Sequence, residues 1–193
     1  IFIGIDAAAS EFFHKGKYIL TDRKKGLSSD ELINYWIDLI NKFPILSLED
    51  PFHEGDFSGF INLQNQVGKR IQIVGDDLFV TSSKKLQEGI KKNIGNSILI
   101  KLNQVGSLSE TLETINLAKK NDFNTIISHR SGETEDNFIA DLSVATGSGQ
   151  IKTGSVSRSD RNSKYNQLLR IEEELGNKAI YCGNEILNKI NKG

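Results

Sequence analysis

Six short apolar segments of this 193-residue chain each run into an ionisable residue. In chain order, these residues are Asp6, Glu49, Asp76, Lys101, His129 and Lys152. The first three are acids and the last three are bases, and Arg130 and Ser131 directly follow the histidine. If the segments are strands of one closed parallel sheet, their carboxyl ends share one mouth, where barrel enzymes place their catalytic groups. We therefore expect acids and bases to face a common site.

The three acids predict a site for a hard divalent cation. Three carboxylates directed at one point repel each other unless a cation lies between them, and magnesium accepts such oxygen ligands. No second histidine or cysteine accompanies them, which argues against zinc. Taken singly, Asp6 could cap a turn, Glu49 could pair with a lysine, and Asp76 could be a loop residue beside Asp77. Three acids at consecutive strand ends favour the metal site.

The basic residues favour a phosphorylated carboxylate as substrate. Arg130 can bind phosphate through two parallel hydrogen bonds, and Ser131 adds a hydroxyl donor. We expect Lys101 and Lys152 to lie near other cations and the metal, which favours the neutral amine that a general base needs. Alternatively, Lys101 is only a solvated strand end and His129 a core residue. The polar, glycine-containing turn that follows the histidine favours a substrate-facing role.

Other features receive a structural interpretation. The segment Gly147–Ser155 superficially resembles a phosphate-binding P-loop, but Ile151 stands where that motif needs glycine before its lysine. His14 and His53 have no comparable setting, so we expect both at the surface. Cys182 is expected to be an incidental thiol.

Amphipathic helical segments separate most of the apolar segments. Ser28 with Glu31, and Ser107 with Glu110, are candidate capping boxes for two of them. The helices are expected at about 29–43, 57–67, 83–93, 108–118, 135–146 and 162–175. About six strand–helix alternations predict a parallel α/β sheet. Functional residues at every strand end favour a TIM-type (β/α) barrel over an open doubly wound sheet. With six units instead of eight, the barrel is expected to be incomplete.

Composition restricts the partners and the compartment. With 24 basic and 25 acidic residues the net charge is −1, so neither nucleic acid nor an anionic membrane is expected as the main partner. One cysteine favours a reducing, cytoplasmic location, and the apolar runs are too short for a membrane span. The chain lacks methionine and starts within an apolar segment, so we expect a fragment of a longer protein.

Several motifs resemble those of enolases, most closely the bacterial ones. They are Ser47–Phe52, Gly75–Leu78, Ile100–Gln104, Ser128–Thr134, Gly149–Gly154 and Lys164–Glu173, and the similarity runs from Gly4 to about Gly183. The resemblance implies the C-terminal catalytic barrel of this glycolytic, magnesium-dependent lyase, which interconverts 2-phosphoglycerate and phosphoenolpyruvate. It implies Mg²⁺ ligands at Asp6, Glu49 and Asp76, and catalytic roles for Lys101, as the base, and His129. The implied substrate-binding residues are Glu49, Lys101, His129, Arg130, Ser131 and Lys152.

The resemblance also implies parts that these residues do not supply. Enolases carry an N-terminal α+β domain and the first barrel units, which provide the general acid, mobile loops and help for a second Mg²⁺. Residues 1–193 are thus expected to be one partial barrel domain that is inactive alone and belongs to a homo-oligomer. A non-catalytic binding or scaffold role, with the cell surface as a second location, stays open and could involve Lys189 and Lys192. A related barrel enzyme acting on an unphosphorylated acid is disfavoured by Ser128–Ser131.

Overall fold

A computed structural model describes residues 1–23, 25–183 and 185–186. Six parallel strands form one sheet, in which every strand pairs with its neighbours in chain order. The strands are β1 (Ile3–Asp6), β4 (Ile45–Glu49), β5 (Gln72–Gly75), β6 (Ser97–Ile100), β7 (Asn124–Ser128) and β8 (Ile151–Lys152). Since β1 and β8 are the two edges of this sheet, the described residues form an incomplete barrel, and the predicted fold class is confirmed.

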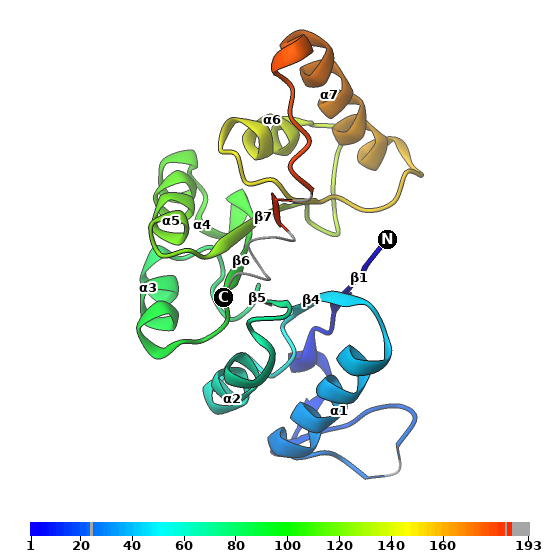
Figure 1. Cartoon of the computed structure of the whole chain (residues 1–193), viewed down its shortest axis with the longest axis vertical. Coiled ribbons are helices and arrows are strands. Elements are labelled where there is room, and N and C mark those ends of the chain that lie inside the picture. The colour runs from blue at the N-terminus through cyan, green and yellow to red at the C-terminus, as the bar shows by residue number, and fades with distance from the viewer. Residues whose placement is uncertain (24, 184, 187–193) are drawn as a thin grey trace.

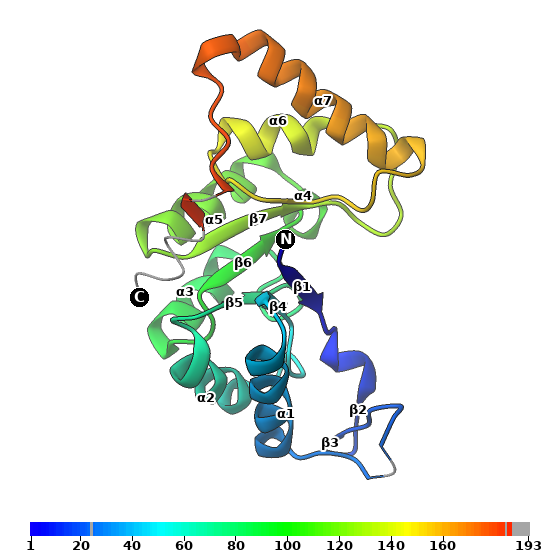
Figure 2. The same ribbon diagram turned by 45° about the vertical axis from the view of Figure 1, so that its right-hand side comes forward.

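Helices connect successive strands and lie around the outside of the sheet (Figures 1 and 2). The main ones are α1 (Ser29–Lys42), α2 (Phe57–Val67), α3 (Ser83–Lys92), α5 (Leu108–Lys120), α6 (Phe138–Ala145) and α7 (Ser159–Leu175). The shorter elements are η1 (Ala9–Phe12), β2 (Phe13–His14), β3 (Lys17–Tyr18), α4 (Leu102–Val105) and η2 (Gly176–Lys178). Each βα unit buries the apolar face of its helix against the sheet, which leaves the connecting turns to form the site.

Of the two predicted capping boxes, the one at α1 is confirmed and the one at α5 is only half formed. At α1, the Ser28 hydroxyl accepts the Glu31 N–H at 3.3 Å, and the Glu31 carboxylate accepts the Ser28 N–H at 2.7 Å. At α5, the Ser107 hydroxyl accepts the Glu110 N–H at 3.3 Å. The Glu110 carboxylate, however, accepts the serine hydroxyl at 2.6 Å instead of its N–H, so the reciprocal bond of a capping box is missing.

Two helix starts differ from the prediction. Helix α6 begins at Phe138, three residues later than expected, because Asp136 accepts the Phe138 N–H at 3.0 Å and ends the preceding turn. Helix α7 begins at Ser159, three residues earlier than expected. Its first turn therefore includes Arg161, which the prediction left outside the helix.

The β2–β3 hairpin was not predicted. Tyr18 anchors it, because its side chain is fully buried and its hydroxyl donates a hydrogen bond to Asp56 Oδ2 at 2.7 Å. His14 is exposed, as predicted. His53 is half-buried instead, because its ring lies against Phe13 with 4.6 Å between ring centres.

The core lies between the central strands and the inner faces of the outer helices. Strands β5 and β6 are buried along their whole length, whereas β1 is mostly exposed. This packing holds the carboxyl ends of β5 and β6 firmly in place. None of the described helices is both long and apolar enough to cross a bilayer.

Candidate active site

All six predicted strand-end residues lie at the carboxyl edge of the sheet. Asp6, Glu49 and Lys152 are the last residues of β1, β4 and β8, and Asp6 is the register partner of Glu49. Asp76, Lys101 and His129 directly follow β5, β6 and β7 in the same way. Parallel pairing therefore brings side chains that are far apart in sequence to one edge.

Lys152 joins the two ends of the sheet. Its Nζ lies 2.8 Å from Asp6 Oδ2 and 2.9 and 3.0 Å from the two carboxylate oxygens of Glu49. Because β8 and β1 are opposite edges in the pairing order, a flat sheet would keep these groups far apart. The contact shows that the sheet curves as a barrel does, so that its first and last described strands face each other.

Lys101 contacts the third acid. Its ammonium group pairs with Asp76 Oδ2, and the amide of Gln104 donates to Asp76 Oδ1 at 3.0 Å. Both oxygens of the Asp76 carboxylate are therefore held by side chains that follow β6. Three ion pairs, Lys152 with Asp6, Lys152 with Glu49 and Lys101 with Asp76, therefore join acids to bases along the edge.

Thr81 connects these groups to the loop after β5. Its hydroxyl accepts the backbone N–H of Lys101 at 2.9 Å and donates to Gln104 Oε1 at 2.5 Å. Val80 and Thr81 have φ values of 44° and 55°, a left-handed conformation that β-branched residues rarely adopt. Such strain persists where the surroundings fix it, and it clusters at functional sites. The sequence prediction missed Thr81 and Gln104, because no local pattern indicates this contact.

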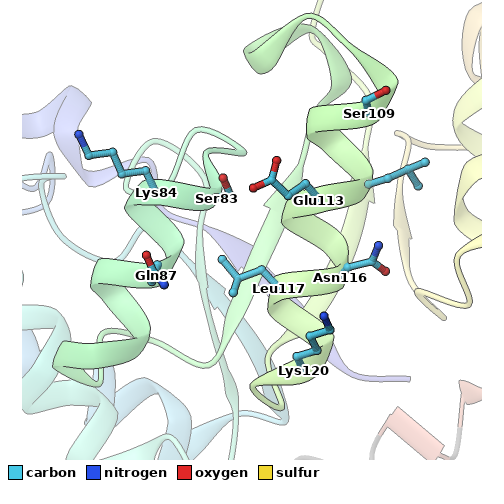
Figure 3. A pocket seen from close by; sticks show the side chains of 9 residues that line it. Ser83, Lys84, Gln87, Ser109, Glu113, Asn116, Leu117 and Lys120 are labelled. Carbon is cyan, nitrogen blue, oxygen red and sulfur yellow. The ribbon is translucent and has the colours of Figure 1, made fainter.

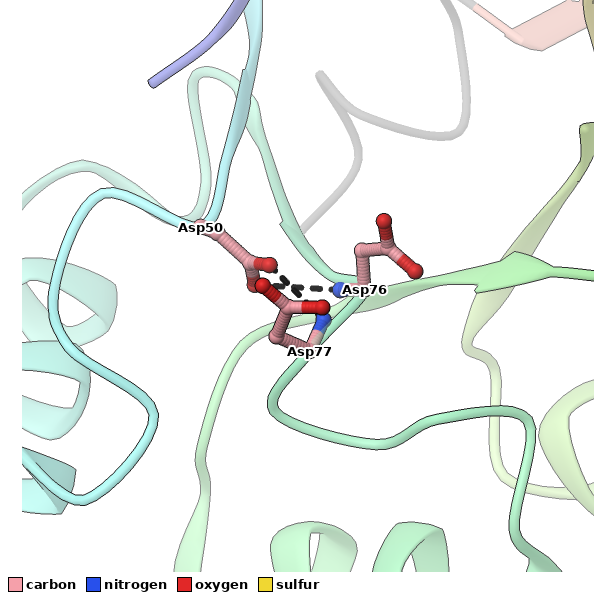
Figure 4. Close-up of side chains that lie close together, drawn as sticks. All are labelled: Asp50, Asp76 and Asp77. Atoms are coloured by element: carbon pink, nitrogen blue, oxygen red, sulfur yellow. Dashed lines mark hydrogen bonds between the residues drawn. The ribbon is translucent and has the colours of Figure 1, made fainter. Parts of the chain in front are cut away.

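A second acidic group lies beside the first. Oxygens of Asp50, Asp76 and Asp77 lie within 4.8 Å of one another. Asp50 accepts the backbone N–H of Asp76 at 3.0 Å and that of Asp77 at 2.7 Å (Figure 4). Figure 4 also shows the Asp76 carboxylate turned away from the other two. Asp50 thus fixes the backbone that directs Asp76 toward Lys101, and it too was missed by the sequence prediction.

Burial disfavours the charged forms of Glu49 and Asp50. Burial raises the pKa of Glu49 to about 7, and Lys152 opposes the shift only in part. Burial also raises the pKa of Asp50 to about 7, against its two N–H bonds. A divalent cation next to either carboxylate would therefore stabilise its charged form.

The expectation that neighbouring cations lower the pKa of Lys152 is wrong. Burial lowers its pKa, but the hydrogen bonds and charges of Asp6 and Glu49 outweigh burial and raise it. The physical reason is that its nearest charged groups are carboxylates, whereas we expected cations. In this structure Lys152 is a counter-ion for the acids, not a neutral amine.

The residues after β7 form the predicted cationic loop. Arg130 and Ser131 are exposed at its tip, and the Arg130 guanidinium donates to Asn103 at 2.8 Å. The loop is fixed from beneath by α7, whose fully buried Lys164 donates to the Thr134 carbonyl at 2.6 Å and pairs with Glu133 at 2.8 Å. Lys164 lies in a segment recognised from sequence, but its role as a support was not predicted.

A groove elsewhere has no part in this site. It has a volume of about 670 Å³ and lies between α3 and α5 on the outside of the sheet (Figure 3). Its lining includes Lys84, Glu113 and Lys120 and none of the strand-end residues. We assign it no role in the chemistry.

A comparison with models of protein families decides the relationship. The family described as "Enolase, C-terminal TIM barrel domain" matches residues 1–190. The chain belongs to the enolase C-terminal barrel family. Membership confirms the predicted resemblance and places this enolase barrel domain in a family of lyase-type enzymes. The metal ligands and the catalytic roles within the enolase barrel stay predictions.

Proposed function

We propose that the full-length protein containing this chain catalyses the magnesium-dependent interconversion of 2-phosphoglycerate and phosphoenolpyruvate. One observation carries the proposal: acids from β1, β4 and β5 meet lysines from β6 and β8 at a single edge, within hydrogen-bonding distance. This edge is where barrel enzymes act. Membership in the enolase barrel family supports the same reaction type.

The residues at this edge fit a magnesium ion. The available donors are carboxylate oxygens, which Mg²⁺ prefers. The Lys152 ammonium group already lies between Asp6 and Glu49, and the Lys101 ammonium group pairs with Asp76. Asp6, Glu49 and Asp76 would hold the ion. When bound, Mg²⁺ stabilises the negative charge that develops on the substrate carboxylate. Enolase-superfamily sites are a known example of a lysine or histidine base working with magnesium.

The side chains at this edge then have separate roles toward the substrate. Lys101 acts as the general base and takes the proton from the carbon next to the substrate carboxylate. Lys152 offers its ammonium to that carboxylate, and Arg130 and Ser131 bind the phosphate. Hydroxide leaves from the neighbouring carbon, with help from a general acid that the resemblance assigns to an earlier part of enolases. His129 contributes a polar group beside the phosphate-binding residues.

The test uses the full-length protein and 2-phosphoglycerate. Formation of phosphoenolpyruvate is followed by ultraviolet absorbance, with Mg²⁺ and after removal of metal with EDTA. We expect turnover that needs Mg²⁺, and Lys84→Ala on the outer groove should leave it unchanged as a matched lysine control. No product in the presence of Mg²⁺, or turnover that survives EDTA, would count against the proposal.

The alternative binding role receives no support from the described residues. Lys189 and Lys192, which could contribute to such a role, lie outside the described residues. The cytoplasmic location, the second location at the cell surface and the homo-oligomeric state stay predictions.

A further inference from the structure

Helix α7 directs a buried guanidinium at the loop after β7. The Arg161 side chain is only 10% exposed. Its Nη1 lies 2.5 Å from His129 Nδ1 and donates to the Arg130 carbonyl at 3.1 Å. Its Nη2 donates to the Ser131 carbonyl at 3.0 Å. One side chain thus contacts three consecutive residues that the sequence singled out for substrate binding.

The residues around Arg161 fix the position of its side chain. Gly154 has a φ of +78°, and a Cβ atom there would lie 2.9 Å from Arg161 Cδ, so a larger residue would collide with the arginine. Asp160 Oδ2 lies 3.3 Å from Arg161 Nε and balances its charge. The Tyr165 hydroxyl donates to the Gly154 carbonyl and fixes the glycine segment against α7. The position of Arg161 is therefore determined from several sides.

The contact with His129 determines where the imidazole carries its proton. A guanidinium has only N–H donors and stays protonated in proteins. His129 Nδ1 must therefore accept the hydrogen bond, and the proton of the neutral ring lies on Nε2. Burial and the Arg161 charge both lower the pKa of His129, which agrees with a neutral ring. The second nitrogen is thus a donor.

We propose that Arg161 is a positioning residue that fixes His129 as the neutral Nε2–H tautomer and holds the peptide groups of Arg130 and Ser131. As far as the substrate is concerned, this inference rests on the proposed function. His129, Arg130 and Ser131 then offer an imidazole N–H, a guanidinium and a hydroxyl. Such a set of donors is suited to the anionic oxygens of a phosphate group. In this arrangement His129 donates a hydrogen bond and does not accept the substrate proton, which leaves that role to Lys101.

The experiment measures the tautomer directly in the full-length protein. Histidine labelled with ¹⁵N gives separate imidazole nitrogen shifts, and His129→Gln identifies the signals of this ring. We expect an unprotonated Nδ1 and a protonated Nε2 near neutral pH. In Arg161→Gln and the milder Arg161→Lys, the ring should become a mixture of tautomers and titrate at higher pH, because the fixed donor and its nearby charge are lost or displaced. The wild-type spectrum tests the assignment even if a variant does not fold.

A matched control lies directly before the same helix. Arg158 pairs with the same Asp160, at 3.1 Å, but is 70% exposed and has no contact with the 129–131 loop among the described hydrogen bonds and ion pairs. Arg158→Gln should leave the His129 signals unchanged. Arg161→Lys should also weaken binding of inorganic phosphate, measured by calorimetry, by about tenfold, which is the order expected for the loss of one hydrogen bond to a charged group.

The outcomes separate this inference from the proposed function. A wild-type His129 with its proton on Nδ1, or a tautomer unchanged in both Arg161 variants, overturns the inference even in an active enzyme. The expected spectrum in a protein without 2-phosphoglycerate turnover supports the role of Arg161 and contradicts only the proposed reaction.

Discussion

Two groups of acids could hold the metal, and one pair of substitutions distinguishes them. The first group is Asp6, Glu49 and Asp76 at the strand ends, and the second is Asp50, Asp76 and Asp77. They share Asp76, so the informative changes are Asp6→Asn and Asp77→Asn. Each change removes one charge and keeps the side-chain size. We expect the metal in the first group, because both oxygens of Asp50 already accept backbone N–H groups.

The expected difference is large enough to decide the matter. Loss of a residue that only supports a metal ligand costs about 10–100-fold in affinity, so loss of a direct carboxylate ligand should cost at least about 100-fold. That is about 3 kcal/mol. Asp6→Asn also frees Lys152 from one ion pair, but half-exposed pairs contribute only about 0–1 kcal/mol, too little to reverse the effect. Asp77→Asn keeps its backbone N–H bond to Asp50 and should change affinity by less than about threefold, or 0.6 kcal/mol.

The assay is calorimetric titration of Mg²⁺ into the full-length protein after treatment with EDTA. Denaturant unfolding of each variant checks that the fold is intact. If Asp77→Asn weakens binding strongly while Asp6→Asn does not, the metal lies in the Asp50 group and its assignment to the strand-end acids is wrong.

Three further predictions follow from the same contacts. Below about pH 7, binding of Mg²⁺ should release a proton, and its affinity should rise as the pH approaches that value, because the carboxylate form of Glu49 is needed. Calorimetry in buffers of different ionisation enthalpy measures the proton release, and its absence would contradict the prediction. Since the folded pKa values of Glu49 and Asp50 are raised, their contribution to stability is lost with rising pH. The Tm of metal-free protein should therefore fall between about pH 5 and pH 8, and an increase would be the wrong sign. Gln104→Leu should weaken Mg²⁺ binding by about 10–100-fold, because the Asp76 carboxylate loses the hydrogen bond that orients it. Gln87→Leu on the outer groove is the control, and unchanged affinity in Gln104→Leu would show that Gln104 does not orient the acid.

The strand ends were predictable because their signal is local. Each buried strand is a short run of β-branched residues, and the ionisable residue follows it directly in the sequence. The regular alternation with amphipathic helices then places all six ends on one side without knowledge of any contact. Helix α2 was predicted with its full bounds, Phe57–Val67, for the same reason.

The supporting residues were not predictable because their roles depend on distant contacts. Arg161 reaches a loop that lies 30 to 32 residues earlier, and Asp50 binds N–H groups 26 and 27 residues later. Thr81 needs an unfavourable backbone conformation that no propensity predicts. The charge state of Lys152 was wrongly predicted since it depends on which neighbours lie closest, and the curvature of the sheet determines that.

Isotope exchange tests the central claim most directly: that Lys101 removes a proton from a substrate held at this edge. The full-length protein is incubated with 2-phosphoglycerate and Mg²⁺ in D₂O, and deuterium at the carbon next to the carboxylate is measured by NMR. We expect exchange by the wild type and a loss of about two to four orders of magnitude in Lys101→Ala, with Mg²⁺ affinity nearly unchanged. Exchange in Lys101→Ala within about threefold of the wild-type rate, less than 1 kcal/mol, would contradict it.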